Sequence, residues 1–135
     1  MNRQTSTEAL IFRIVLILYI IAVAYLCFAN INNIQNIPRR FLNLETDKVI
    51  HFCMFFPFPI LGFLAYGRKT GSVRESITIM ICICAYGIIF AGLTELVQGM
   101  MPYRTEDLKD YKADILAIVI ASCTTLVADI IRHHR

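Results

Sequence analysis

Four long apolar runs divide this sequence and constrain its fold more than any other feature. They cover approximately residues 10–29, 49–66, 77–101 and 115–131, and most charged residues lie between them. A helix needs about 20 apolar residues to cross the hydrocarbon core of a bilayer, and each run is near that length. Backbone polar groups inside lipid must be paired within the chain, which a helix achieves. The sequence therefore predicts one all-α domain over residues 1–135, an integral membrane bundle of about four transmembrane helices.

Composition and charge narrow the classes of partner. The chain is 57% hydrophobic and only 17% charged, which is typical of a protein whose surroundings are membrane lipids. Its formal charge of +3 comes without basic residues interleaved with aromatic ones, so we expect no nucleic-acid partner. The five cysteines form no C-x-x-C pair, so neither a disulfide framework nor a cysteine metal site is predicted.

Two local features modify this simple pattern. Pro57 and Pro59 lie inside the second run, and because proline removes backbone donors, we expect a bend near residues 55–59. Asp129 lies almost at the far end of the fourth run, beside Arg132, and we interpret it as an ion-pair partner rather than a site residue.

Basic residues near the ends of the runs indicate how the chain crosses the membrane. The N-terminus, the segment 67–76 and the C-terminus hold seven of the 13 Lys and Arg residues, and 67–76 is the densest group. Cytoplasmic loops are enriched in these residues. We therefore expect a multi-pass protein of the cell membrane with both termini in the cytoplasm, and with the segments 30–48 and 102–114 outside.

Antiparallel spans bring three polar groups to one side of the membrane. The start of the second span, the end of the third and the start of the fourth must lie at similar depth. Their polar residues form a candidate pocket: Asp47, Lys48, His51, Glu95, Gln98, Arg104, Asp107, Asp110 and Asp114. Spacings of three and four within each group place its members on one helix face.

Glu95 is the most informative member, because it lies about two turns below the end of its span. An ionised group in hydrocarbon costs several kcal/mol, so Glu95 should face the interior and have a partner. Arg104 is the first candidate partner, followed by Lys48 and His51. The alternative is that Glu95 and Arg104 only hold two helices together.

The remaining acids and the histidine also allow more than one interpretation. Asp107, Asp110 and Asp114 form either a solvated acidic face or, with Glu95 and His51, an oxygen-rich site for a divalent cation such as magnesium. No cofactor is predicted from the spacing alone. His51 is a proton carrier, a ligand or a hydrogen-bonded interior histidine.

The motifs resemble a known family. The segment Asp47-Lys48-Val49-Ile50-His51-Phe52, followed by Glu95-x-x-Gln98-x-x-x-Pro102-x-Arg104-x-x-Asp107-x-x-Asp110, is similar to the VanZ-like family of small bacterial membrane proteins. The resemblance covers roughly residues 47–117. Asp114 and Ala117 stand where that family usually has Asn and Gly. The resemblance implies functional roles for seven of the pocket residues, namely Asp47, Lys48, His51, Glu95, Gln98, Arg104 and Asp110.

Three functions remain open at this point. The resemblance implies a link to the glycopeptide teicoplanin, because the family's named member is linked to low-level resistance to it. The first hypothesis is binding of an amphiphile, either a lipid-linked cell-wall intermediate or a lipidated glycopeptide, at the extracytoplasmic face. The second is a metal-dependent enzyme acting on a lipid head group, with His51 or Glu95 as general base, although the chain shows no nucleophile motif. The third is a structural subunit or small transporter, in which a homo-oligomer would enlarge the pathway.

Overall fold

The computed structural model describes residues 3–29, 40–41, 44–67, 70–102 and 107–133, and all statements below concern these residues. Five helices make up almost all of this part. They are α1 (Arg3–Phe28), α2 (Thr46–Phe55), α3 (Pro57–Tyr66), α4 (Val73–Gly99) and α5 (Leu108–His133). An antiparallel pair of two-residue strands, β1 (Arg40–Phe41) and β2 (Leu44–Glu45), precedes α2.

Four helical segments are long and apolar enough to cross a membrane, which confirms the predicted all-α membrane bundle and fits a multi-pass membrane protein. They are Thr7–Phe28, Thr46–Tyr66, Val73–Gly99 and Leu108–His133. Helices α4 and α5 begin before the apolar runs 77–101 and 115–131, because polar residues cap their first turns. The Ser72 hydroxyl accepts a hydrogen bond from the Glu75 N–H at 3.3 Å. The carboxylate of Asp107, the residue before α5, accepts a hydrogen bond from the Lys109 N–H at 2.8 Å.

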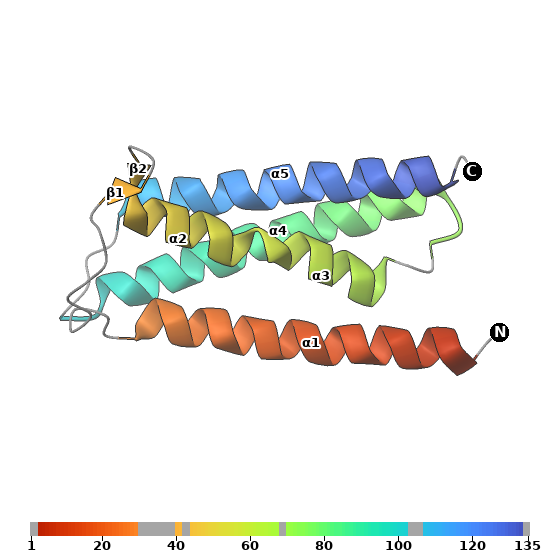
Figure 1. The fold of residues 1–135 in the computed structure, drawn as a ribbon, viewed down its shortest axis with the longest axis horizontal. Helices are drawn as coiled ribbons and strands as arrows, with labels where there is room; N and C mark the ends of the chain where they lie inside the picture. The colour runs from red at the N-terminus through yellow and green to blue at the C-terminus, as the bar shows by residue number, and fades with distance from the viewer. Residues whose placement is uncertain (1–2, 30–39, 42–43, 68–69, 103–106, 134–135) are drawn as a thin grey trace.

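The second span is broken, as its prolines predict. Helix α2 ends at Phe55 and α3 begins at Pro57, with Phe56 between them. Pro57 has no backbone N–H to donate into the preceding turn, so the helix is interrupted there. Figure 1 shows α3 following α2 toward the end of the bundle that holds the termini, with the break between them.

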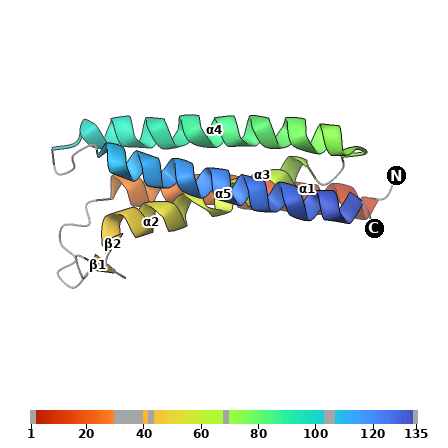
Figure 2. The same ribbon diagram turned by 90° about the horizontal axis from the view of Figure 1, so that it is seen from above.

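The spans alternate in direction, so both ends of the chain lie at the same end of the bundle (Figures 1 and 2). Helix α5 packs against α4, α2 and α3, whereas α1 packs mainly against α3. At the end of the bundle away from the termini, the start of α2, the end of α4 and the start of α5 come together. This is the juxtaposition that the order of the apolar runs predicts.

Small residues allow the helices to approach closely at the centre of the bundle. Ala91, Ala117 and Ala121 are fully buried. A Cβ atom added at Gly87 would lie 2.9 Å from a ring carbon of Phe58, so only glycine fits at this crossing. Outside this core, the helices expose many large apolar side chains, as lipid-facing surfaces do.

A second polar network joins α4 to α5 near the chain termini. The predicted ion pair of Asp129 and Arg132 is confirmed, with 2.5 Å between Oδ1 and Nη2. Asp129 is nevertheless buried, because it also accepts a hydrogen bond from the Ser76 hydroxyl at 2.6 Å. Sequence reasoning missed this bond because it placed Ser76 in the polar segment 67–76, whereas Ser76 is a buried residue of α4.

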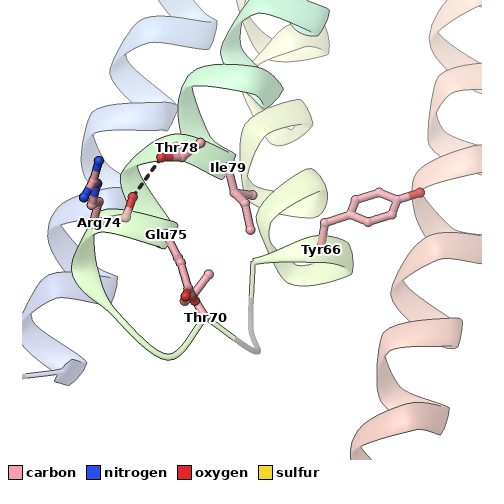
Figure 3. Close-up of a pocket in the computed structure, with 6 residues that line it drawn as sticks. All are labelled: Tyr66, Thr70, Arg74, Glu75, Thr78 and Ile79. Carbon is pink, nitrogen blue, oxygen red and sulfur yellow. Dashed lines mark hydrogen bonds between the residues drawn. The ribbon is translucent and has the colours of Figure 1, made fainter.

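A cavity of about 370 Å³ lies at the same end, where the chain turns from α3 into α4 (Figure 3). Its lining residues are Tyr66, Thr70, Arg74, Glu75, Thr78 and Ile79. Tyr66 points toward α1, where the Arg13 guanidinium stands 5.0 Å from the centre of its ring. This cavity is remote from the predicted polar pocket and contains none of its residues.

Candidate functional site

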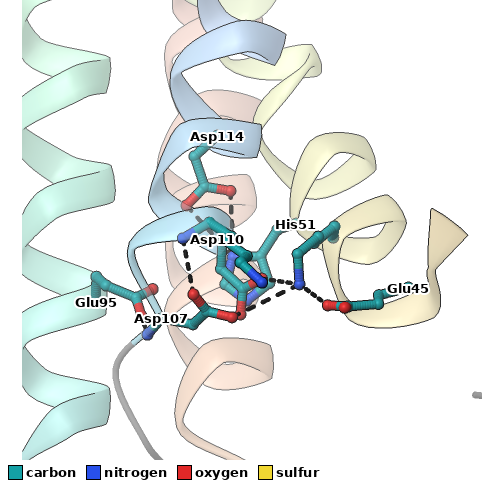
Figure 4. Close-up of polar contacts among 8 residues, drawn as sticks. Glu45, His51, Glu95, Asp107, Asp110 and Asp114 are labelled. Carbon is teal, nitrogen blue, oxygen red and sulfur yellow. Dashed lines mark hydrogen bonds and ion pairs between the residues drawn. The ribbon is translucent and has the colours of Figure 1, made fainter.

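Eight of the nine predicted pocket residues lie in the described part of the chain, at the end of the bundle away from the termini. Arg104 lies outside the described residues, so its expected pairing with Glu95 stays a prediction. Asp47, Lys48 and His51 come from α2, Glu95 and Gln98 from α4, and Asp107, Asp110 and Asp114 from the start of α5 and the residue before it. Figure 4 shows the side chains of His51, Glu95, Asp107, Asp110 and Asp114 near one another between these three helices.

His51 and Asp114 form the centre of the site. The Nδ1 atom of His51 lies 3.2 Å from Oδ1 and 3.3 Å from Oδ2 of Asp114. Both side chains are closed off from solvent, with 2% of His51 and none of Asp114 exposed. A buried imidazole held by a carboxylate has a fixed orientation, which is a common arrangement in catalytic and metal sites.

Glu95 is buried within the bundle, as its depth in the span predicts. Its Oε1 atom accepts a hydrogen bond from the Asp107 N–H at 2.5 Å, one of the backbone donors left free at a helix start. Its Oε2 atom has no hydrogen-bond partner within the described residues. Glu95 therefore caps α5, a role that the search for a charged partner did not anticipate.

Lys48 pairs with acids other than Glu95. Its Nζ atom contacts Glu45 and lies 3.6 Å from carboxylate oxygens of Asp107 and Asp110. The hydrogen bond from the Lys109 N–H, helped by the charge of Lys48, lowers the pKa of Asp107 below its usual range. Lys48 thus joins the strand pair before α2 to the start of α5.

Gln98 is used differently from the rest of the set. Its amide nitrogen donates to the carbonyl oxygen of Cys27 at 2.9 Å, near the end of α1. The Tyr19 hydroxyl makes a similar link from α1 to the Met54 carbonyl. These bonds hold α1 against the other helices and give Gln98 a structural role. The role in a site that the resemblance implies for Gln98 stays a prediction.

Two overlapping groups of side chains in the cluster have the spacing of metal ligands. One is Asp47, His51 and Asp110, and the other is His51, Glu95 and Asp114. Within each group, one potential ligand atom from every residue lies within 4.8 Å of the others. The second group is entirely buried.

An apolar groove adjoins this cluster on the outside of the bundle. It lies along one turn of α2 and one turn of α5, and has a volume of about 380 Å³. Its lining residues are Lys48, Val49, Phe52, Ala113 and Leu116. Lys48 is thus shared between the groove and the polar cluster. Hydropathy alone did not reveal the groove, because its apolar residues are as hydrophobic as those on lipid-facing helix surfaces.

Comparisons with known proteins identify one relative of uncharacterized function. No protein-family model matches the chain, and no solved structure matches it. The chain is 36% identical over 90 residues to the uncharacterized protein C11E3.10 of Schizosaccharomyces pombe. The match covers 66% of this chain and 49% of the yeast protein, so the chain spans about half the length of that relative.

Proposed function

We propose that this chain is a VanZ-like membrane protein of the cell envelope that binds an amphiphilic lipid in the groove between α2 and α5. The observation that carries this proposal is the position of Lys48, which lines the apolar groove and also contacts the polar cluster. An amphiphile needs an apolar wall and a polar end in one continuous site. The groove and Lys48 supply both.

The groove suits a hydrocarbon chain. Val49, Phe52, Ala113 and Leu116 provide its walls, and Lys48 is the ionisable residue among its described lining residues. Its volume of about 380 Å³ is within the range of small-molecule sites, which is about 300–1,000 Å³. Because the groove opens toward the lipid-facing side of the helices, a prenyl or acyl chain enters it without crossing water.

The polar end suits a phosphate or carboxylate head group. Lys48 is only partly buried, with 22% of its side chain exposed, so a head group that displaces the exposed carboxylate of Glu45 can reach its Nζ atom. Charge-assisted hydrogen bonds to such groups are stronger than neutral ones. Arg104 has the same role in this proposal, on the basis of the family resemblance. A lipid-linked cell-wall intermediate and a lipidated glycopeptide such as teicoplanin both present this chemistry.

The binding proposal is tested by blocking the groove. The Ala113→Phe variant fills it from α5 without changing an ionisable residue. Ile20→Phe is the matched control, because Ile20 lines a separate apolar cavity of about 390 Å³ between α1, α3 and α4. Each protein is purified in a native membrane mimic and its bound lipids are measured by mass spectrometry. We expect an anionic prenyl or acyl lipid with wild type and Ile20→Phe and its loss from Ala113→Phe. Identical lipid profiles in all three proteins would refute the proposal.

The proposal also places the groove's polar end outside the cell, since both termini are assigned to the cytoplasm. A background without the native cysteines carries one new cysteine, either Ser72→Cys near the chain termini or Lys109→Cys beside the cluster. An impermeant maleimide added to whole cells should label Lys109→Cys and not Ser72→Cys. The reverse labelling would place the site in the cytoplasm.

A second candidate function is a metal-dependent enzyme acting on a lipid head group. The contact between His51 and Asp114 favours it, because a carboxylate that orients an imidazole also makes it a better general base. His51→Ala and Asp114→Asn would then abolish turnover alike. Lipid binding without any turnover in wild type would leave the binding function alone.

A further inference from the structure

Negative charge is concentrated in the polar cluster beyond what its described cations balance. Five carboxylates lie in or beside it, those of Asp47, Glu95, Asp107, Asp110 and Asp114. The described basic side chains in or beside it are Lys48, His51 and Lys109, fewer than the carboxylates. Buried carboxylates are costly unless a cation or proton compensates them. The cluster thus has the electrostatic character of a cation site.

Three of these side chains are also arranged around a common point. His51, Glu95 and Asp114 come from three different helices, all are buried, and each has a potential ligand atom within 4.8 Å of the other two. Ligands on opposite sides of one ion are separated by about 4.4 Å, twice a bond of about 2.2 Å. Shifts of a few tenths of an ångström would therefore place all three on one cation.

The contact between His51 and Asp114 has a matching geometry. Its two distances of 3.2 and 3.3 Å are nearly equal, so the imidazole nitrogen faces the middle of the carboxylate. Neighbouring ligand atoms on one ion are about 3.0–3.4 Å apart when the bonds are about 2.1 Å long. The pair therefore already has the separation of two adjacent ligands.

The unpaired oxygen of Glu95 points independently to a ligand. Only 7% of Glu95 is exposed, and its Oε2 atom makes no hydrogen bond to any described residue. Its other oxygen is held by the Asp107 N–H, which fixes the orientation of the carboxylate. A buried, oriented acceptor that no described residue satisfies is costly by itself, and a bound cation would satisfy it.

From this geometry we propose that His51, Glu95 and Asp114 bind a divalent transition-metal cation of the Mn²⁺ or Zn²⁺ type. One imidazole nitrogen with two carboxylates suits such ions, whereas Mg²⁺ and Ca²⁺ prefer oxygen ligands alone. Three protein ligands leave at least one coordination position for water or a head-group oxygen. Asp47 and Asp110 share His51 in the neighbouring group and add negative charge beside the ion. The site stands apart from the proposed lipid binding, because it involves no residue that lines the groove.

Metal binding by the purified protein tests this proposal directly. Full-length protein is stripped with a chelator and titrated with Mn²⁺, and the signal of free Mn²⁺ is followed by electron paramagnetic resonance. Zn²⁺ is then added as a competitor. We expect one equivalent of Mn²⁺ to bind wild type, and the dissociation constant to rise at least tenfold in Glu95→Gln and Asp114→Asn. Asp129→Asn is the matched control, since Asp129 is an equally buried α5 carboxylate at the other end.

The opposite results would overturn the proposal. They are the absence of saturable Mn²⁺ and Zn²⁺ binding to wild type, unchanged binding in both site variants, or an equal loss in Asp129→Asn. A second measurement guards against variants that fail to fold. Mn²⁺ should raise the thermal unfolding midpoint of wild type and Asp129→Asn, and a wild-type midpoint that does not respond would also overturn the site.

Discussion

The contact between His51 and Asp114 makes a quantitative prediction about stability. The Asp114→Val variant leaves the His51 Nδ1 atom in the closed interior without its carboxylate, 3.2 Å away in wild type. An unsatisfied buried polar group costs about 1–3 kcal/mol. The His51→Leu variant leaves the Asp114 carboxylate without its imidazole, and breaking a buried pair in this way costs about 3–5 kcal/mol.

The double variant distinguishes an interacting pair from two independent residues. Replacing both members of a buried polar pair by apolar residues is often nearly neutral, because no orphaned group remains. We therefore expect His51→Leu with Asp114→Val to be more stable than His51→Leu alone. For a nearly neutral double variant, the coupling free energy equals the sum of the two single losses, about 4–8 kcal/mol.

Reversible unfolding in mixed micelles titrated with dodecyl sulfate measures these free energies, with helix content followed by circular dichroism. Wild type, the two single variants and the double variant form one thermodynamic cycle. Losses that simply add, with a coupling below about 0.5 kcal/mol, would refute the reasoning. The same four proteins separate stability from function, since the stable double variant should bind no metal.

Three further perturbations test other parts of the bundle. Gly87→Ala should lower the free energy of unfolding by about 1 kcal/mol, since overpacking of about 1–3 kcal/mol exceeds a helix-propensity gain of about 1 kcal/mol. Ser76→Ala should cost about 1–3 kcal/mol in the same assay, because Asp129 loses its 2.6 Å hydrogen bond. The lowered pKa of Asp107 means that its cap on the Lys109 N–H is intact above the ordinary aspartate pKa of about 3.9 and is lost as pH falls through the lower folded value. The protection factor of that amide, which corrects for the intrinsic pH dependence of exchange, should therefore fall only below about pH 3.9, and it should stay constant over this range in Asp107→Asn.

The Gly87→Ala and Ser76→Ala predictions each have a matched control. A Cβ atom at Gly92 would lie 3.6 Å from the Tyr111 ring, an ordinary contact, so Gly92→Ala should not destabilise the protein. Thr78 is exposed and its hydroxyl bonds only within its own helix, to the Arg74 carbonyl, so Thr78→Ala should change stability by less than about 0.5 kcal/mol. Equal losses of stability in Gly87→Ala and Gly92→Ala would contradict the close packing at Gly87. Equal losses in Ser76→Ala and Thr78→Ala would contradict the role of the Ser76 hydrogen bond.

The fold was largely predictable because hydropathy and proline act locally along the chain. The apolar runs located four spans, and the prolines located the break at Phe56. The alternation of spans then placed His51, Glu95 and Asp110 at one end, since depth in a bundle follows from the order of the spans alone. No knowledge of side-chain contacts was needed for this step.

The contacts within the site depend on how each helix is rotated, which spacing within one helix does not determine. Sequence reasoning placed Asp114 in the pocket but left its role open, whereas in the structure its carboxylate oxygen lies 3.2 Å from His51 Nδ1. It also did not anticipate the hydrogen bond from the Asp107 N–H to Glu95, while the expected pairing of Glu95 with Arg104 stays a prediction. The bond from Gln98 to the Cys27 carbonyl connects α4 to α1 and has no signal in either segment alone.

The break at Phe56 has a mechanical consequence for the site. After the break, α3 packs against α1, α4 and α5, whereas α2, before the break, packs mainly against α5. Pro57 and Pro59 already withhold two backbone donors at this joint, so a change of angle there costs little hydrogen bonding. Helix α2 can thus change its angle relative to α3 at Phe56, midway along the second span. Tilting it by a few degrees alters the width of the groove along Phe52 while the helices beneath it stay packed.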